Sequence, residues 1–105
     1  MAYKVILSPQ ARRDVRETTD YLAAQTDNER AKTWKNGILE AIGTLTQMPL
    51  RCAIAGESQE LGVELRQLMV RPHRILFRVH EGAQRVDVLR VYHSARAPLQ
   101  IDDLV

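Results

Sequence analysis

Apolar residues recur at every second position at the start of the chain, where Tyr3, Val5 and Leu7 alternate with Lys4 and Ile6. A period of two residues predicts a β-strand, because successive side chains point to opposite faces. Ser8 and Pro9 follow this strand. Serine caps helix N-termini, and proline suits the first helical position because its φ is already fixed near the helical value. We therefore expect a short strand followed by a helix that begins at Pro9.

The apolar period then lengthens to three and four residues in two stretches, 9–25 and 29–48, which is typical of amphipathic helices. The first apolar stripe consists of Ala11, Val15, Thr18 and Leu22. The second consists of Ala31, Trp34, Ile38, Ala41, Ile42, Leu45 and Met48. Polar residues 26–28 break the pattern, and Pro49 ends it. With so short a connection, the two helices should form an antiparallel hairpin.

Residues 50–62 contain glycine and serine without a hydrophobic period and are predicted to form a loop. Three strands are expected after it, at 63–70, 74–80 and 86–92, with a glycine-containing turn at 81–84. Helices followed by a run of strands favour an antiparallel sheet with the helices on one face. The predicted fold class is therefore α+β: an N-terminal strand, an antiparallel helical hairpin and a three-stranded antiparallel meander.

Length and composition narrow the class of protein. A chain of 105 residues with 45% hydrophobic residues suits one globular domain spanning residues 1–105. No apolar run reaches the roughly 18–20 residues of a membrane span, and the N-terminus does not resemble a signal peptide. Cys52 is the one cysteine, and no histidine pair has the spacing of a metal site. We expect a cytoplasmic protein without a metal, a cofactor or a membrane partner.

Positive charge is concentrated in the last third of the chain. Between residues 64 and 96, seven arginines stand against three acidic residues, an excess of four positive charges without any lysine. Arginine suits planar, two-pronged contacts with phosphate or carboxylate groups. On the exposed face of a sheet, the same arginines could equally serve only to keep the protein soluble and to protect the sheet edges. Composition alone does not separate these alternatives.

The pairing of the last two strands gives the arginines a possible focus. If residues 74–80 and 86–93 pair across the turn, His73 and Arg74 should lie near Tyr92 and His93, with Arg96 close behind. Cationic and titratable side chains would then meet at one end of the sheet. Such a cluster could bind an anion or assist phosphodiester cleavage. Each residue also has a structural explanation: the tyrosine could pack at the strand end, and Arg74 could pair with Glu57, Glu60 or Glu64.

Segments along nearly the whole chain resemble the RelE/ParE superfamily of bacterial toxins. They are residues 3–11, Asp14, 20–22, Leu45, 48–49, 65–68, 73–79, 88–93 and Arg96. The resemblance implies a helical hairpin on an antiparallel sheet and a toxin of a type II, plasmid-stabilisation-type toxin–antitoxin system. Its members have one of two activities: RelE-like toxins cut messenger RNA, usually in the ribosome, and ParE-like toxins inhibit DNA gyrase. In both cases, the C-terminal segment of an antitoxin wraps the toxin and silences it.

The site residues implied by this resemblance differ between the two activities. For a RelE-like endoribonuclease, Arg74, His93 and Arg96 match the catalytic positions. The segment 51–62 lacks the lysines of such nucleases, however, and no tyrosine follows Arg96. ParE-like toxins often carry a histidine and an arginine after the last strand as well, and the helical pair ending at 48–49 resembles theirs. The sequence therefore favours gyrase inhibition, with ribosome-dependent mRNA cleavage as the alternative.

The partners and binding residues follow from that interpretation. The expected target- or anion-binding residues are Arg66, Arg71, Arg78, Arg90 and Tyr92. The expected partners are DNA gyrase, or the ribosome and mRNA in the alternative, together with a cognate antitoxin. The antitoxin should form a hetero-oligomer with the toxin by covering apolar surface left by the helical hairpin or by the sheet edge. A third possibility is a module that only binds antitoxin and has lost its own activity.

Overall fold

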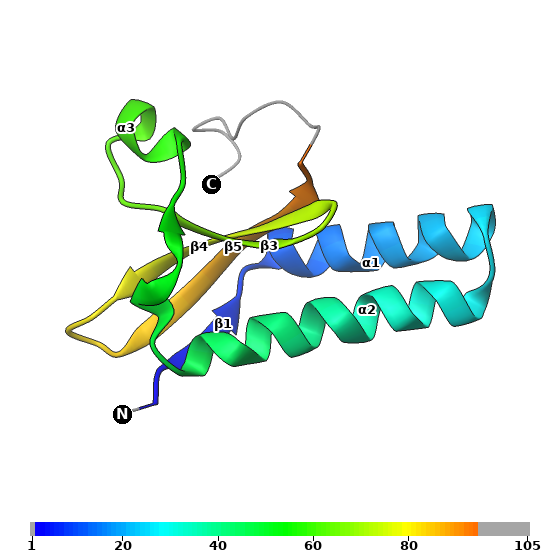
Figure 1. Cartoon of the computed structure of the whole chain (residues 1–105), viewed down its shortest axis with the longest axis horizontal. Coiled ribbons are helices and arrows are strands. Elements are labelled where there is room, and N and C mark those ends of the chain that lie inside the picture. The colour runs from blue at the N-terminus through cyan, green and yellow to red at the C-terminus, as the bar shows by residue number, and fades with distance from the viewer. Residues whose placement is uncertain (1, 95–105) are drawn as a thin grey trace.

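The computed structural model describes residues 2–94, which form two long helices, a third short helix and one sheet (Figure 1). The strands are β1 (Lys4–Leu7), β2 (Ala53–Ile54), β3 (Arg66–Val70), β4 (His73–His80) and β5 (Arg85–His93). The α-helices are α1 (Pro9–Gln25), α2 (Asn28–Gly43) and α3 (Glu57–Leu61), and two 3₁₀ turns span Thr44–Thr46 and Pro49–Arg51. No helix in this part of the chain is long and apolar enough to cross a membrane.

The five strands form one sheet in the order β1-β5-β4-β3-β2. Strands β2 to β5 pair antiparallel, whereas β1 runs parallel to β5, so the first strand lies beside the last. The α+β class with a helical hairpin on a mainly antiparallel sheet is confirmed. The meander has one strand more than predicted, because the two-residue β2 extends the outer side of β3.

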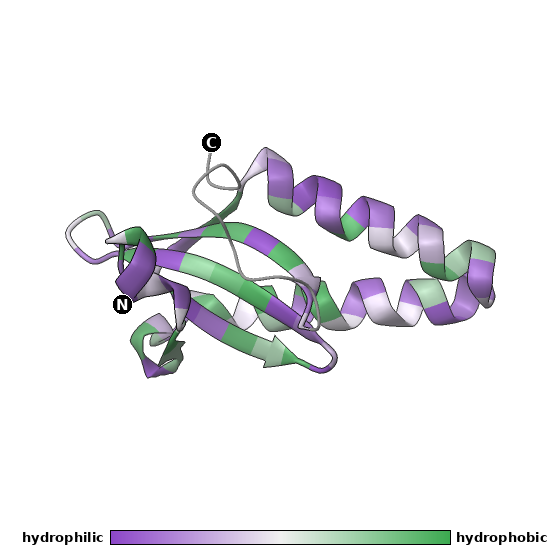
Figure 2. Cartoon of the chain, turned by 90° about the horizontal axis from the view of Figure 1, so that it is seen from above, coloured by the Kyte–Doolittle hydropathy of each residue, from purple (hydrophilic) through white to green (hydrophobic). Residues whose placement is uncertain are grey.

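Side-chain caps explain where the two long helices begin. Ser8 accepts a hydrogen bond from the amide of Ala11 at 3.0 Å, and Asp27 accepts one from the amide of Arg30 at 2.8 Å. Hydrophobic and hydrophilic residues alternate in bands along both helices, as expected for helices buried on one side (Figure 2). The helices lie antiparallel, and their connected ends project beyond the sheet (Figure 1).

The second helix is shorter than predicted. It ends at Gly43 rather than Met48, and a 3₁₀ turn continues the chain. Met48 has a left-handed φ of 47° and is 73% exposed, so its expected place in the core is wrong. A residue before proline is sterically discouraged from right-handed helical geometry, which agrees with the non-helical backbone of Met48.

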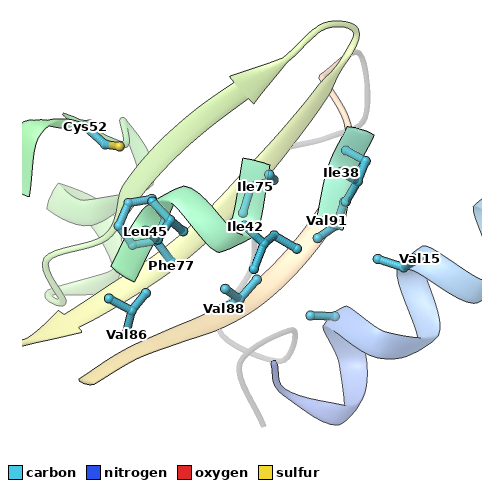
Figure 3. Close-up of a cluster of buried hydrophobic side chains, with 11 residues drawn as sticks. Val15, Ile38, Ile42, Leu45, Cys52, Ile75, Phe77, Val86, Val88 and Val91 are labelled. Atoms are coloured by element: carbon cyan, nitrogen blue, oxygen red, sulfur yellow. The ribbon is translucent and has the colours of Figure 1, made fainter. Parts of the chain in front are cut away.

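The hairpin packs on one face of the sheet through a continuous apolar cluster (Figure 3). Its buried members are Ala11, Val15, Ile38, Ile42, Leu45, Cys52, Ile75, Phe77, Val86, Val88 and Val91. A bulge in β5 contributes to this packing, since Phe77 pairs with Val88 and Leu76 pairs with Arg90, which leaves Leu89 as an extra residue. The extra residue allows Val88 and Val91 to face the helices together, although they are three positions apart.

The segment predicted as a loop, 50–62, contains the short elements β2 and α3. A helix of five residues is too short to show a hydrophobic period, which explains why the sequence pattern did not reveal it. Cys52, at the start of the segment, still packs in the cluster under the hairpin, whereas the part from Ala55 onward packs on the other face of the sheet. It covers a second, smaller cluster formed by Ala55, Leu65, Leu76 and Tyr92. Both faces of the sheet are therefore covered.

Candidate functional site

The last two strands pair as predicted from the sequence. His73 lies opposite His93, and Arg74 lies opposite Tyr92, at the end of the sheet away from the β4–β5 turn. Arg96 lies outside the described residues. The prediction that His73 and Arg74 lie next to Tyr92 and His93 on paired strands is therefore confirmed.

The sheet nevertheless divides this cluster, because neighbouring residues of a strand point to opposite faces. His73 and His93 point to the helix-covered face, where their rings meet edge to face with centroids 5.4 Å apart. Arg74 and Tyr92 point to the other face, beside Glu57 of α3. The expectation that Arg74 and His93 converge is therefore wrong: they are close in register and separated by the thickness of the sheet.

On the face covered by α3, Arg74 forms a buried ionic network. Its two Nη atoms donate to the two carboxylate oxygens of Glu57 at 3.0 and 2.8 Å. Nη2 also donates to Oε1 of Gln67 at 2.8 Å, and the hydroxyl of Tyr92 donates to Glu57 at 3.2 Å. The exposed fractions of the Arg74 and Glu57 side chains are 13% and 6%. The arginine therefore acts as a bidentate clamp on an internal carboxylate.

The environment of this network shifts two pKa values upward. The hydrogen bond to Glu57 stabilises the charged guanidinium and raises the pKa of Arg74 against the opposing effect of burial. Burial raises the pKa of Tyr92, because the phenolate form would lose its hydration. Both groups therefore remain protonated at neutral pH and act as hydrogen-bond donors. Neither is placed to accept a proton.

On the helix-covered face, His73 bridges β4 to α2. Its Nδ1 accepts a hydrogen bond from Nε1 of Trp34 at 3.2 Å, and the two rings meet edge to face. Burial lowers the pKa of His73, and the charge of nearby His93 lowers it further. His73 is therefore neutral at pH 7, with its Nδ1 lone pair directed at the indole.

These rings border a groove of about 760 Å³ between the helical hairpin and the end of the sheet. Its lining includes Tyr21, Leu22, Trp34, His73, Val91 and His93. The outer rim is partly open, since Tyr21 is 63% exposed. The groove is mainly apolar, with polar atoms contributed by the imidazoles and by α1.

The other predicted binding residues occupy different environments. Arg90 is buried and forms a bidentate ion pair with Asp14 of α1, at 2.8 and 3.0 Å. Arg66 donates to the carbonyl oxygens of Leu50 and Cys52 and thereby holds the chain before β2. Arg71 and Arg78 are exposed. Of the predicted binding residues, Arg71 and Arg78 are thus accessible to a partner, whereas Arg90 and Tyr92 are enclosed.

Three residues with important contacts were not proposed as site residues from the sequence: Asp14, Trp34 and Glu57. Asp14 borders the buried stripe of α1. Its carboxylate also accepts a hydrogen bond from the backbone amide of Val91 at 2.9 Å and so satisfies a donor at the edge of β5. The position of Asp14 next to the buried Val15 was the only sign in the sequence of an internal partner for its carboxylate. That partner, the amide of Val91, lies 77 residues away in the sequence. Within residues 2–94, no group of three potential ligands is arranged to hold a metal ion.

This fold, a helical hairpin packed on a five-stranded sheet with the first strand parallel to the last, is shared with solved toxin–antitoxin proteins of the ParE and RelE types. The structure resembles the chromosomal ParDE toxin–antitoxin system from P. aeruginosa, with a TM-score of 0.71 and 21% identity over 88% of this chain and 96% of that chain. It also resembles the RelBE2 toxin–antitoxin complex from Mycobacterium tuberculosis, with a TM-score of 0.57 and 24% identity over 91% and 95% of the two chains.

The family is given by the sequence comparison. A family model described as the ParE toxin of the type II toxin–antitoxin system parDE matches residues 5–98. The chain therefore belongs to the ParE toxin family. No curated protein sequence matches it.

Proposed function

We propose that this toxin arrests growth by inhibiting DNA gyrase without cleaving RNA. The observation that carries the proposal is the state of Arg74, one of the three residues expected to serve a nuclease. Both of its Nη atoms are engaged by Glu57, and the side chain is 13% exposed. A guanidinium in this position cannot stabilise the charge that develops on a scissile phosphate unless its internal partner leaves. Membership of the ParE family supports the same interpretation.

The accessible arginines are the best candidates for contact with gyrase. Arg71 and Arg78 are exposed; Arg71 lies in the turn before β4, and Arg78 lies two residues before the end of that strand. Charged groups at the rim of an interface mainly accelerate association and orient the partners. We expect them to steer the toxin to an acidic surface of its target in the cytoplasm.

Purified toxin should block supercoiling by gyrase and leave mRNA intact in a translation reaction. Arg71→Ala and Arg78→Ala should each weaken inhibition about three- to tenfold, an effect that added salt should reduce. Arg13→Ala, which removes an exposed arginine from α1, is the matched control and should inhibit like the wild type. Supercoiling that continues while messages are cut would reject the proposal and favour the RelE-like ribonuclease.

We further propose that an apolar segment of a cognate antitoxin neutralises the toxin by lying in the groove between the hairpin and the sheet. The groove is largely lined by apolar and aromatic side chains, and Tyr21 at its rim is 63% exposed. An exposed tyrosine beside an apolar depression is a typical anchor of a protein interface. The two solved relatives are themselves toxin–antitoxin systems, which supports a hetero-oligomer here.

Tyr21→Glu should weaken antitoxin binding by at least about tenfold in a titration, because it places a charge in the apolar contact. Leu39→Glu is a suitable control: Leu39 is 42% exposed on α2 and does not line this groove. Both variants should melt close to the wild-type temperature, since neither residue is buried. Equal loss of binding in the two variants, or none in either, would move the antitoxin to another surface.

A further inference from the structure

Residues 56–62, called the flap below, comprise α3 with one glycine at each end. Ser58 links the flap to the chain just before β3. Its Oγ donates a hydrogen bond to the carbonyl oxygen of Leu65 and accepts one from the amide of Leu65, both at 2.9 Å. Gly62 takes a left-handed φ of 68°, which favours glycine at this turn. Glu57 supplies the ionic contact between the flap and the strands.

The donors that hold Glu57 belong to the sheet rather than to the flap. Arg74 and Tyr92 are cross-strand partners in β4 and β5, and Arg74 lies over the tyrosine ring with its Cζ 5.6 Å from the centroid. Gln67 on β3 fixes one Nη of the guanidinium at 2.8 Å. Strand pairing therefore organises a guanidinium fork and a hydroxyl that point to one position. This geometry suits any oxyanion that presents two oxygens, whether carboxylate or phosphate.

A second guanidinium also approaches this tyrosine: the Cζ atom of Arg90, which is paired with Asp14, lies 5.8 Å from the centroid of the same ring. A buried guanidinium that loses its carboxylate is strongly destabilised, and binding another anion relieves that cost. A five-residue helix is not stable by itself, so the flap depends on its contacts with the sheet.

We propose that Arg74 and Tyr92 form an oxyanion site on the sheet, that Glu57 fills it as an internal ligand, and that a phosphate group takes the same position when the flap lifts. The flap is then a self-inhibitory cover over a binding site. The phosphate is either free or part of a nucleic-acid backbone. Arg74 and Glu57 lie on the α3 side of the sheet, whereas Tyr92 also borders the antitoxin groove. Phosphate binding at this site is compatible with the proposed function, because Arg74 and Tyr92 are both hydrogen-bond donors, and cleavage of RNA also needs a group that accepts a proton.

The test uses Glu57→Ala and Glu57→Gln, with Glu60→Ala as the matched control because Glu60 is an exposed acid of the same helix. Each protein is titrated with inorganic phosphate against chloride at equal ionic strength, followed by amide NMR and thermal unfolding. Glu57→Ala should bind phosphate at least about tenfold more tightly than the wild type or Glu60→Ala. The gain should disappear in the double variant Glu57→Ala/Arg74→Ala and weaken in Glu57→Ala/Tyr92→Phe.

A loss of folding in Glu57→Ala is also informative. Phosphate should then restore the folded state of that variant, or of Glu57→Gln, and should fail when Arg74 is also replaced. Equal phosphate responses with and without Arg74, in folded or unfolded protein, would overturn the proposal. A short single-stranded RNA identifies the source of the phosphate. Tighter binding than inorganic phosphate, dependent on Arg74, indicates a nucleic-acid backbone, and binding no tighter indicates the free ion.

Discussion

The two faces of the sheet are covered by structures of very different size. On one face, helices of 17 and 16 residues pack through a continuous apolar cluster. On the other, a five-residue helix is attached through a small apolar cluster and an ionic network. Apolar packing is dense and has little directional preference, whereas an ion pair depends on the presence of both charges. The comparison suggests that the helix face maintains the fold and that the flap face can change its occupant.

The most direct comparison uses two adjacent, fully buried residues that point to opposite faces. Ile75→Ala should cost about 4 kcal/mol in free energy of unfolding, because the helices above it cannot close the cavity. Leu76→Ala should cost about 2–3 kcal/mol, because the flap can settle into the space. Denaturant unfolding measures both values. Equal costs, or the reverse order, would show that the flap is packed as rigidly as the helices.

The ion pair between Asp14 and Arg90 allows a second test, because it joins α1 to the edge of β5. Asp14→Ala should cost about 3 kcal/mol, since it leaves a buried guanidinium and the amide of Val91 without their carboxylate. Asp20→Ala removes an exposed acid from the same helix and should change stability by less than about 0.5 kcal/mol. Replacing Arg90 by methionine in the Asp14→Ala background should recover much of the loss. Failure to recover would indicate that the Val91 amide dominates.

The smallest predicted effect is a dependence of the helix face on pH. Burial and His93 lower the pKa of His73 in the folded protein, so the unfolded chain takes up a proton first, near its ordinary pKa of about 6.5. The contribution of His73 is fully present above that pH and declines as the pH falls below it. Stability measured from about pH 8 to 5 should therefore fall less steeply in His73→Gln than in the wild type.

The environment of His73 includes Trp34 on α2, His93 on β5, and Asp14 and Glu17 from α1, which border the same groove. Trp34 is the sole tryptophan of the chain, so its fluorescence reports the protonation of His73 directly. His80→Gln alters the opposite face and should leave this fluorescence transition unchanged. A transition that persists in His73→Gln would assign it to another group.

Much of the fold followed from the sequence because it rests on short-range patterns. The alternation near Val5, the serine cap and proline at 8–9, and the stripe from Ala31 to Leu45 each predicted an element that the structure contains. The pairing of the last two strands followed from the turn between them. Each of these signals lies within a short segment, so the elements can be predicted from a single sequence.

The site was less predictable because its contacts join distant segments. The sequence offered Glu57 as one of three possible partners for Arg74, and geometry was needed to select it. The bulge at Leu89 and the left-handed turn at Met48 also leave no regular hydrophobic pattern. Most importantly, a list of nearby residues does not reveal that Arg74 and His93 lie on opposite faces. That distinction separates one suspected nuclease cluster into two groups of side chains on opposite faces of the sheet.

The position of β5 has a consequence for the synthesis of this toxin. This strand lies between β1 and β4, and its backbone is bonded to Ser8 and Asp14, residues made some eighty positions earlier. During translation, the sheet therefore lacks a central strand until nearly the whole described chain has left the ribosome. A partly synthesised chain has neither covered face complete. The cell consequently meets a folded toxin only after the chain has left the ribosome as far as the end of β5.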